Sequence, residues 1–218
     1  MDWELIFSSI WPLLDGAIRG TIPLALVSFV LGLVLALLAA LARLSPRWWL
    51  SAIARFYISV IRGTPLIVQL YVVFFGLPSI DVVIPPWPSA ILVLSLNVGG
   101  YAAEIIRAAI LSIPRGQWEA AYTIGMPRWL ALRRIILPQA VRVSVPPLSN
   151  TFISLVKDTA LTSLILVTEM FRRAQQIAAF SNEFLLLYIE AAVLYWVICL
   201  VLSAGQGVLE RRLERHAV

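Results

Sequence analysis

The chain has 218 residues, of which 61% are hydrophobic and only 13% are charged. Its mean hydropathy is +0.90, whereas a soluble globular domain is typically about a quarter charged, so water is not its main solvent. The net charge of +5 does not indicate a nucleic-acid-binding protein, because the basic residues form short clusters between apolar stretches. The length suits one membrane domain, residues 1–218, with about five spanning helices of about 20 residues each.

The first two spans are separated by a basic connection. Residues 21–42 are uncharged and long enough to cross a bilayer. The tryptophan pair 48–49 in the connection that follows is typical of a membrane interface, and its arginines favour the cytoplasmic side. A second span is predicted at about 56–76, with a kink where Pro65 removes a backbone donor and disfavours helix at Thr64.

Three further apolar stretches predict the remaining spans. The third is expected at about 87–110, and the fourth at about 143–168, where the adjacent charges at 157–158 interrupt it. A nearly neutral connection around Glu169 leads to the fifth, at about 185–209. Lys and Arg concentrate after the first, third and fifth spans, which predicts an N-terminus outside and a C-terminus inside the cell.

The segment between the third and fourth spans, residues 112–140, is too charged to cross a membrane but is strongly patterned. Residues 117–124 predict a short helix closed by Gly125, which tolerates the left-handed backbone that ends helices. A second, amphipathic helix is predicted from Pro127 until Pro138 ends it. The pattern alone also fits a connector that lies on the membrane surface without a partner.

The spacing within this segment is more specific than its amphipathic character. It resembles the EAA loop of permease subunits of binding-protein-dependent ABC importers, at Glu119-Ala120-Ala121, Gly125, Ile135 and Leu137-Pro138. Three other segments resemble the polar amino-acid branch of this family: RGTPLIVQL (62–70), GGYAAEIIRAAI (99–110) and FISLVKDTALTSLI (152–165). The resemblance implies an all-α, polytopic, type I ABC importer permease fold with about five transmembrane helices and a cytoplasmic coupling-helix loop.

The resemblance also implies a function and a set of partners. It implies a permease subunit of an ATP-driven importer that translocates amino acids into the cytoplasm by alternating access. The implied partners are cytoplasmic ABC ATPase subunits, an extracytoplasmic substrate-binding protein and a second permease subunit, in a bacterial inner membrane. The short helix would dock into the ATPase, with coupling residues Glu119, Ala120, Ala121, Gly125, Leu137 and Pro138.

The chemistry of ATP hydrolysis is expected on a separate subunit. The sequence holds no glycine-rich phosphate-binding loop, so ATP and Mg²⁺ would be bound by the partner ATPase and this chain would carry no cofactor. The only histidine, His216, lies in the C-terminal tail, so no histidine-based metal site is expected. We therefore expect a transporter subunit and not an enzyme.

Polar groups within the spans identify a candidate substrate pathway, because such groups are costly in lipid unless they face a partner or a cavity. Asn97, Tyr101 and Glu104 follow one face of the third span at i, i+4 and i+7. Asp158 is a candidate acceptor for the ammonium group of an amino acid. The other candidates are Thr64, Gln69, Thr162 and Ser163.

Each candidate also has a structural alternative. Glu104 can pair with Arg107 at i+3, and Asn97 and Tyr101 can bond neighbouring helices. Asp158 can bond across a subunit interface or to a broken helix end, and Gln69 can bond a nearby backbone carbonyl.

Other functions also remain open. The same architecture could import another small solute, and a secondary transporter or channel would explain the intramembrane charges without explaining the loop spacing. An intramembrane enzyme is disfavoured because Asp158 is the only carboxylate in its span.

Overall fold

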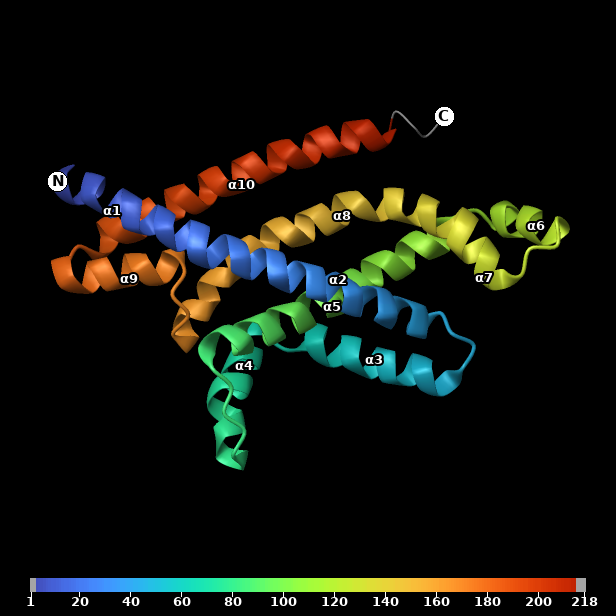
Figure 1. Cartoon of the computed structure of the whole chain (residues 1–218), viewed down its shortest axis with the longest axis horizontal. Coiled ribbons are helices and arrows are strands. Elements are labelled where there is room, and N and C mark those ends of the chain that lie inside the picture. Colours follow the sequence, from blue (N-terminus) through green and yellow to red (C-terminus); the bar gives the residue numbers. More distant parts are fainter. Residues whose placement is uncertain (1–2, 215–218) are drawn as a thin grey trace.

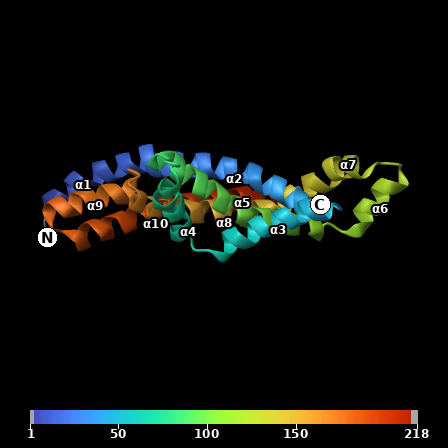
Figure 2. The ribbon, with the colours of Figure 1, turned by 90° about the horizontal axis from the view of Figure 1, so that it is seen from below.

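The computed structural model describes residues 3–214, with side chains for residues 4–212, and the described residues form helices without a β-strand. His216 lies outside the described residues. Most helices run along one long axis, with α1 and α9 at one end and α6 and α7 at the other (Figure 1). The view from below shows a thin, elongated molecule (Figure 2).

The first predicted span is part of a much longer helical segment. Helix α1 (Trp3–Gly16), the π-helical turn η1 (Ala17–Thr21) and α2 (Ile22–Arg43) form one continuous segment of 40 residues from Glu4 to Arg43. The helix therefore begins well before residue 21, where the uncharged run of the predicted span starts. Asp15 and Arg19 lie within this helical segment and pair with each other at i,i+4 over 2.7 Å.

The second predicted span is sharply broken at the predicted kink. Helix α3 (Trp48–Gly63) ends before Thr64 and Pro65, both of which have extended backbones. The chain then forms α4 (Leu66–Tyr71), the π-helical turn η2 (Val72–Gly76) and the 3₁₀-helix η3 (Leu77–Ile80). This second part is bent by 105° from α3 and projects from the bundle (Figure 1). The predicted kink is confirmed, and it turns the chain through more than a right angle.

Helix α5 (Pro86–Ser112) is the central helix of the bundle. Its contact with α2 is close because Gly32 has no side chain: a Cβ built there would lie 2.6 Å from the Cβ of Val98. Small residues at helix contacts let membrane helices approach and gain van der Waals contact. The core around α5 joins buried side chains of α2, α3 and α8. Helix α5 covers the third predicted span, at about 87–110. It is the most buried of the three unbroken helical segments that are long enough to cross a membrane.

The segment after α5 holds the two helices expected there, but the second one does not end where predicted. Helix α6 (Arg115–Thr123) is followed by Gly125 with φ +76°, which confirms the left-handed closure. Helix α7 (Arg128–Ala131), the π-helical turn η4 (Leu132–Ile136) and α8 (Leu137–Asp158) then run on without a stop. Pro138 does not end the helix, because the widened turn η4 lies directly before it and relieves the clash of the proline ring with the preceding turn.

The predicted fourth span and the connection after it also differ from expectation. The α-helix ends at Asp158, and the 3₁₀-helix η5 (Thr159–Ile165) leads to Leu166 with φ +67°. The expected connection is mostly a further helix, α9 (Met170–Ser181). Its axis is bent by 48° from that of the preceding helical segment, Arg128–Ile165. Glu169 explains this helix, because its carboxylate accepts hydrogen bonds from the first free N–H groups of α9. The last helix, α10 (Phe184–Glu214), contains the fifth predicted span.

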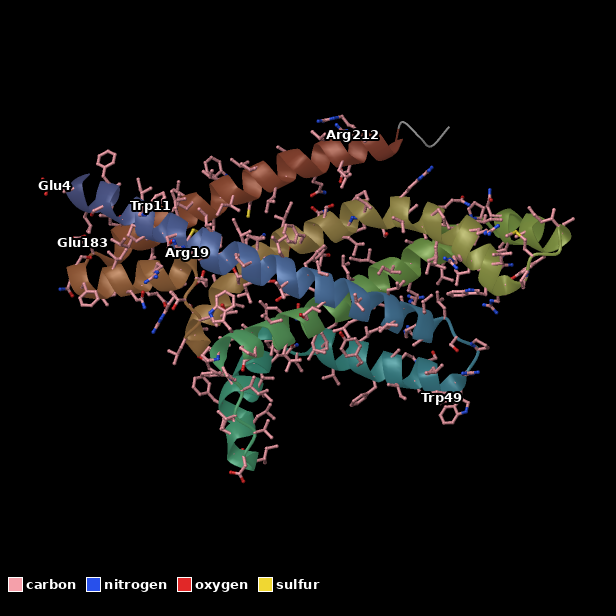
Figure 3. All side chains as sticks on the ribbon, viewed as in Figure 1. Glu4, Trp11, Arg19, Trp49, Glu183 and Arg212 are labelled. Carbon is pink, nitrogen blue, oxygen red and sulfur yellow. The ribbon has the colours of Figure 1, made fainter. Side chains whose placement is uncertain are left out.

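Three helical segments are long and apolar enough to cross a membrane within the described part of the chain. They are Glu4–Arg43, Pro86–Ser112 and Phe184–Arg212, and the number rises to five if each bent pair is counted as one span. The exposed Trp11 and Trp49 lie toward opposite ends of the long axis (Figure 3), as expected of residues at the two membrane interfaces. The all-helical polytopic fold class is confirmed.

Candidate functional site

A cavity of about 410 Å³ lies where the α3–α4 break, α5 and α8 meet. Four of the predicted pathway residues line it: Thr64, Asn97, Tyr101 and Asp158. Asn97 lies about 16 Å from Pro86 and about 22 Å from Ser112 at 1.5 Å per residue, so the cavity is near the middle of the α5 span. Polar and ionisable groups at this depth require a water-filled cavity or a protein partner.

Helix α5 presents Asn97 and Tyr101 to the cavity because glycines occupy its packed side. A Cβ on Gly99 would meet the hydroxyl of Tyr57, and a Cβ on Gly100 would lie 2.7 Å from Cγ2 of Ile61. The Tyr57 hydroxyl donates a hydrogen bond of 2.7 Å to a backbone carbonyl of α5. The glycine side of α5 is therefore fixed against α3, and the polar side is left for the cavity.

Helix α8 supplies a polar wall that sequence reasoning largely missed. Asn150, Ser154 and Asp158 all line the cavity, and their spacing of four residues places them along one helix face. The signal was present in the sequence, since counting back in steps of four from Asp158 finds the other two. Thr151 also lines this wall, and its hydroxyl donates to a backbone carbonyl of its own helix over 2.9 Å.

Glu104 is held elsewhere by two arginines. Its carboxylate lies 2.8 Å from Arg107, the i,i+3 pair expected from the sequence, and 3.4 Å from Arg43 on α2. It is not among the residues that line the cavity. The alternative interpretation, a structural ion pair near the end of α5, is the one that the geometry supports.

Three other candidates, Gln69, Thr162 and Ser163, lie close to the points where α3 and α8 end. The Nε2 of Gln69 donates to the backbone carbonyl of Ile61 over 2.9 Å and to that of Thr64 over 3.2 Å, so it satisfies carbonyls at the end of α3. Thr162 and Ser163 are buried within η5, and the Thr162 hydroxyl donates to a carbonyl one turn earlier over 2.7 Å. None of the three lines the cavity.

Helix α6, which holds the predicted coupling residues Glu119, Ala120 and Ala121, lies at the far end of the molecule from α9 (Figure 1). On α6, Ala121 is fully buried, whereas Glu119 and Ala120 are exposed. Glu119 and its neighbour Trp118 border a groove of about 620 Å³ between α6 and the ends of α2 and α5. Leu137 is half-buried and Pro138 is exposed, and both belong to the continuous α7–α8 helix. The short helix is thus held by one face and presents the other.

No cluster of three or more His, Cys, Asp or Glu residues that could hold a metal ion is found in the described part of the chain.

Comparison with known proteins gives consistent matches over almost the whole chain. The family model described as "Binding-protein-dependent transport system inner membrane component" matches residues 3–215. The chain is 56% identical to the L-cystine transport system permease protein TcyB of Bacillus subtilis, over 99% of this chain and 93% of that one. It is 40% identical to the glutamine transport system permease protein GlnP of Escherichia coli K12, over 98% of both chains. A crystal structure of an amino acid ABC transporter with histidines superposes with a TM-score of 0.92 at 34% identity, covering 97% of this chain and 99% of that chain.

Proposed function

Because this chain belongs to the family of binding-protein-dependent transport system inner membrane components, it is a transport subunit and not an enzyme, and we propose that it imports an amino acid through the cavity around Asp158. The observation that carries this proposal is a carboxylate near the middle of a span, at the wall of a cavity of about 410 Å³. Ionisable groups at such depth commonly mark substrate pathways. The cavity is large enough for one amino acid and has polar groups on three elements.

The roles within the cavity follow from the chemistry of its walls. Asp158 accepts the α-ammonium group of the substrate, and Asn97 and Ser154 offer hydrogen bonds to its other polar atoms. Thr64, at the break between α3 and α4, sits on a joint where a change of helix angle alters the width of the cavity. Names of relatives support the substrate class, since they include transport systems for cystine, glutamine and arginine.

Energy enters through α6. The exposed Glu119 and Ala120 offer one charge and one small surface to a cleft of an ATPase subunit, and Gly125 permits the sharp turn behind them. Leu137 and Pro138 lie on the helix that continues into the cavity wall, so a displacement of α6 is transmitted along α8 toward Asp158. ATP binding would draw two such helices together and open the cavity outward, and hydrolysis would reset it inward.

The complete importer contains two permease subunits, two ATPase subunits that bind ATP and Mg²⁺, and a substrate-binding protein. The distribution of Lys and Arg supports an orientation with α6 and the C-terminus in the cytoplasm and the N-terminus outside a bacterial inner membrane. An extracytoplasmic binding protein then delivers the amino acid near the α9 end of the bundle.

The test is reconstitution of the chain with its ATPase and binding protein in liposomes. ATP-dependent uptake is expected for one class within a panel of cationic, acidic, polar and disulfide-linked amino acids. Asp158→Asn should abolish uptake while ATP hydrolysis by the complex persists, and Gly125→Val should uncouple hydrolysis from uptake. Uptake without ATP would favour a channel or secondary transporter, and unchanged uptake by Asp158→Asn would refute the role of the cavity.

A further inference from the structure

The guanidinium group of Arg62 lies over the ring of Tyr101, with its central carbon 5.4 Å from the ring centroid. Tyr101 lines the cavity that Asp158 also lines. We propose that Arg62 binds the α-carboxylate of the substrate, so that the cavity recognises both charged groups of a free amino acid. This inference rests on the proposed function and identifies the α-carboxylate as a group of the substrate that the protein binds.

The depth of Arg62 in α3 argues that it has a polar ligand. It lies about 21 Å along the helix from Trp48 at 1.5 Å per residue, well within the thickness of a bilayer. A guanidinium cation without a partner at such depth is costly. No carboxylate of the described residues lies within 4.0 Å of its nitrogens, and the side chain is exposed.

The contact with Tyr101 orients the guanidinium group toward this task. An aromatic ring attracts the cation through its face, and a guanidinium group held over a ring keeps its N–H donors free at its edge. These donors form a planar fork that matches the two oxygens of a carboxylate. Tyr101 thus contacts Arg62 through its ring and is also one of the residues that line the cavity.

The charges around the cavity complement a zwitterion. Asp158 on α8 lines the cavity and carries the negative charge. Arg62 at the end of α3 is not a lining residue but carries the positive charge against Tyr101, which lines the cavity from α5. A free amino acid presents an ammonium group and a carboxylate on one carbon, whatever its side chain. The structure therefore predicts that the cavity selects for the free α-amino acid group and leaves discrimination among side chains to other parts of the importer.

Lys157 is the other cation at this depth and provides a matched control. It is exposed, it points about 100° away from Asp158 around the helix, and unlike Arg62 it makes no cation–π contact with Tyr101. Lys157→Gln removes the same charge as Arg62→Gln from a site that the proposal does not use.

The experiment measures equilibrium binding to the permease–ATPase complex in lipid nanodiscs, without the binding protein. The probes are L-cystine, L-glutamine and L-arginine, each with the analogue in which a neutral carboxamide replaces every α-carboxylate. For the amino acid that the unmodified complex binds, Arg62→Gln should weaken binding about tenfold or more and leave binding of its carboxamide within about twofold. Arg62→Lys should recover only part of the affinity, because lysine lacks the planar fork. Lys157→Gln should change neither.

Two results would overturn this inference. One is equal loss of affinity for the amino acid and its carboxamide in Arg62→Gln, which would indicate a structural role only; the other is unchanged affinity for both. Failure of the proposed function looks different, because then Asp158→Asn would bind the amino acid as the unmodified complex does, or the unmodified complex would bind none of the three probes.

Discussion

Removal of the Glu169 carboxylate should destabilise the protein more than any surface substitution. Glu169 is fully buried, although it is an acid. Its oxygens accept hydrogen bonds from the backbone N–H groups of Arg172 at 2.6 Å and Phe171 at 2.8 Å, and from the Tyr195 hydroxyl at 2.7 Å. Thr21 in η1 donates a longer bond of 3.4 Å. One side chain thus joins the start of α9 to α10 and to the first helical segment.

The magnitude follows from what Glu169→Ala would leave behind. Two N–H groups and two hydroxyls, those of Tyr195 and Thr21, lose their acceptor, and a buried donor without a partner costs about 1–3 kcal/mol. Removal of the buried charge offsets part of this cost. We expect the free energy of unfolding to fall by about 3 kcal/mol or more. Glu169→Gln keeps the volume and one acceptor oxygen, so we expect a loss of about 1–2 kcal/mol.

The assay is reversible unfolding of the purified chain in mixed micelles, followed by circular dichroism as the fraction of denaturing detergent rises. Glu183→Ala is the matched control, because Glu183 is exposed at the end of the same region (Figure 3) and should change the free energy of unfolding by less than about 0.5 kcal/mol. If Glu169→Ala were as stable as Glu183→Ala, the carboxylate would not hold these helices together and the reasoning would be refuted.

Three further predictions concern packing, coupling and charge. Gly32→Leu should lower the free energy of unfolding by about 1–3 kcal/mol, because even its Cβ would lie 2.6 Å from Val98, whereas Gly205→Leu, with open space around it, should be neutral in the same assay. Gly125→Val should lose ATP-dependent uptake in liposomes and lower the free energy of unfolding by no more than about 1–2 kcal/mol, because valine at φ +76° strains only the exposed turn; full uptake would contradict this. Glu104→Gln removes two partly exposed ion pairs, with Arg43 and Arg107, and should lower the free energy of unfolding by no more than about 1 kcal/mol, and by less at high salt. A larger loss would contradict the interpretation of Glu104 as a partly exposed ion pair.

The sequence predicts the apolar parts of this fold better than the boundaries between them. The third span and the break at Pro65 follow from hydropathy and from the chemistry of proline, which act locally. Two helix ends do not follow from local rules: Arg19 pairs with Asp15 within a helix that begins before the uncharged run at residue 21, and the π-helical turn η4 accommodates Pro138. Hydropathy and proline rules treat each residue separately, whereas ion pairs and widened turns depend on several residues together.

The candidate site was predictable in part for the same reason. Asn97, Tyr101 and Asp158 were found because polar residues are conspicuous in apolar spans, and the cavity brings them together. Arg62 could not be predicted as a pathway residue, because only the fold brings it into contact with Tyr101. Glu169 was assigned to a connection because nothing in the sequence marks the buried partners that surround it.

The unbroken first segment has a mechanical consequence for the assembled protein. At 1.5 Å per residue its 40 residues extend about 60 Å, more than the roughly 45 Å of a bilayer with its headgroups. It touches Glu169 through Thr21, near its middle, and Glu104 through Arg43, at its C-terminal end. Such a rod acts as a lever: pivoting it by about 10° at one end would sweep the other through about 10 Å, so a small rotation on one side of the membrane can become a large displacement on the other.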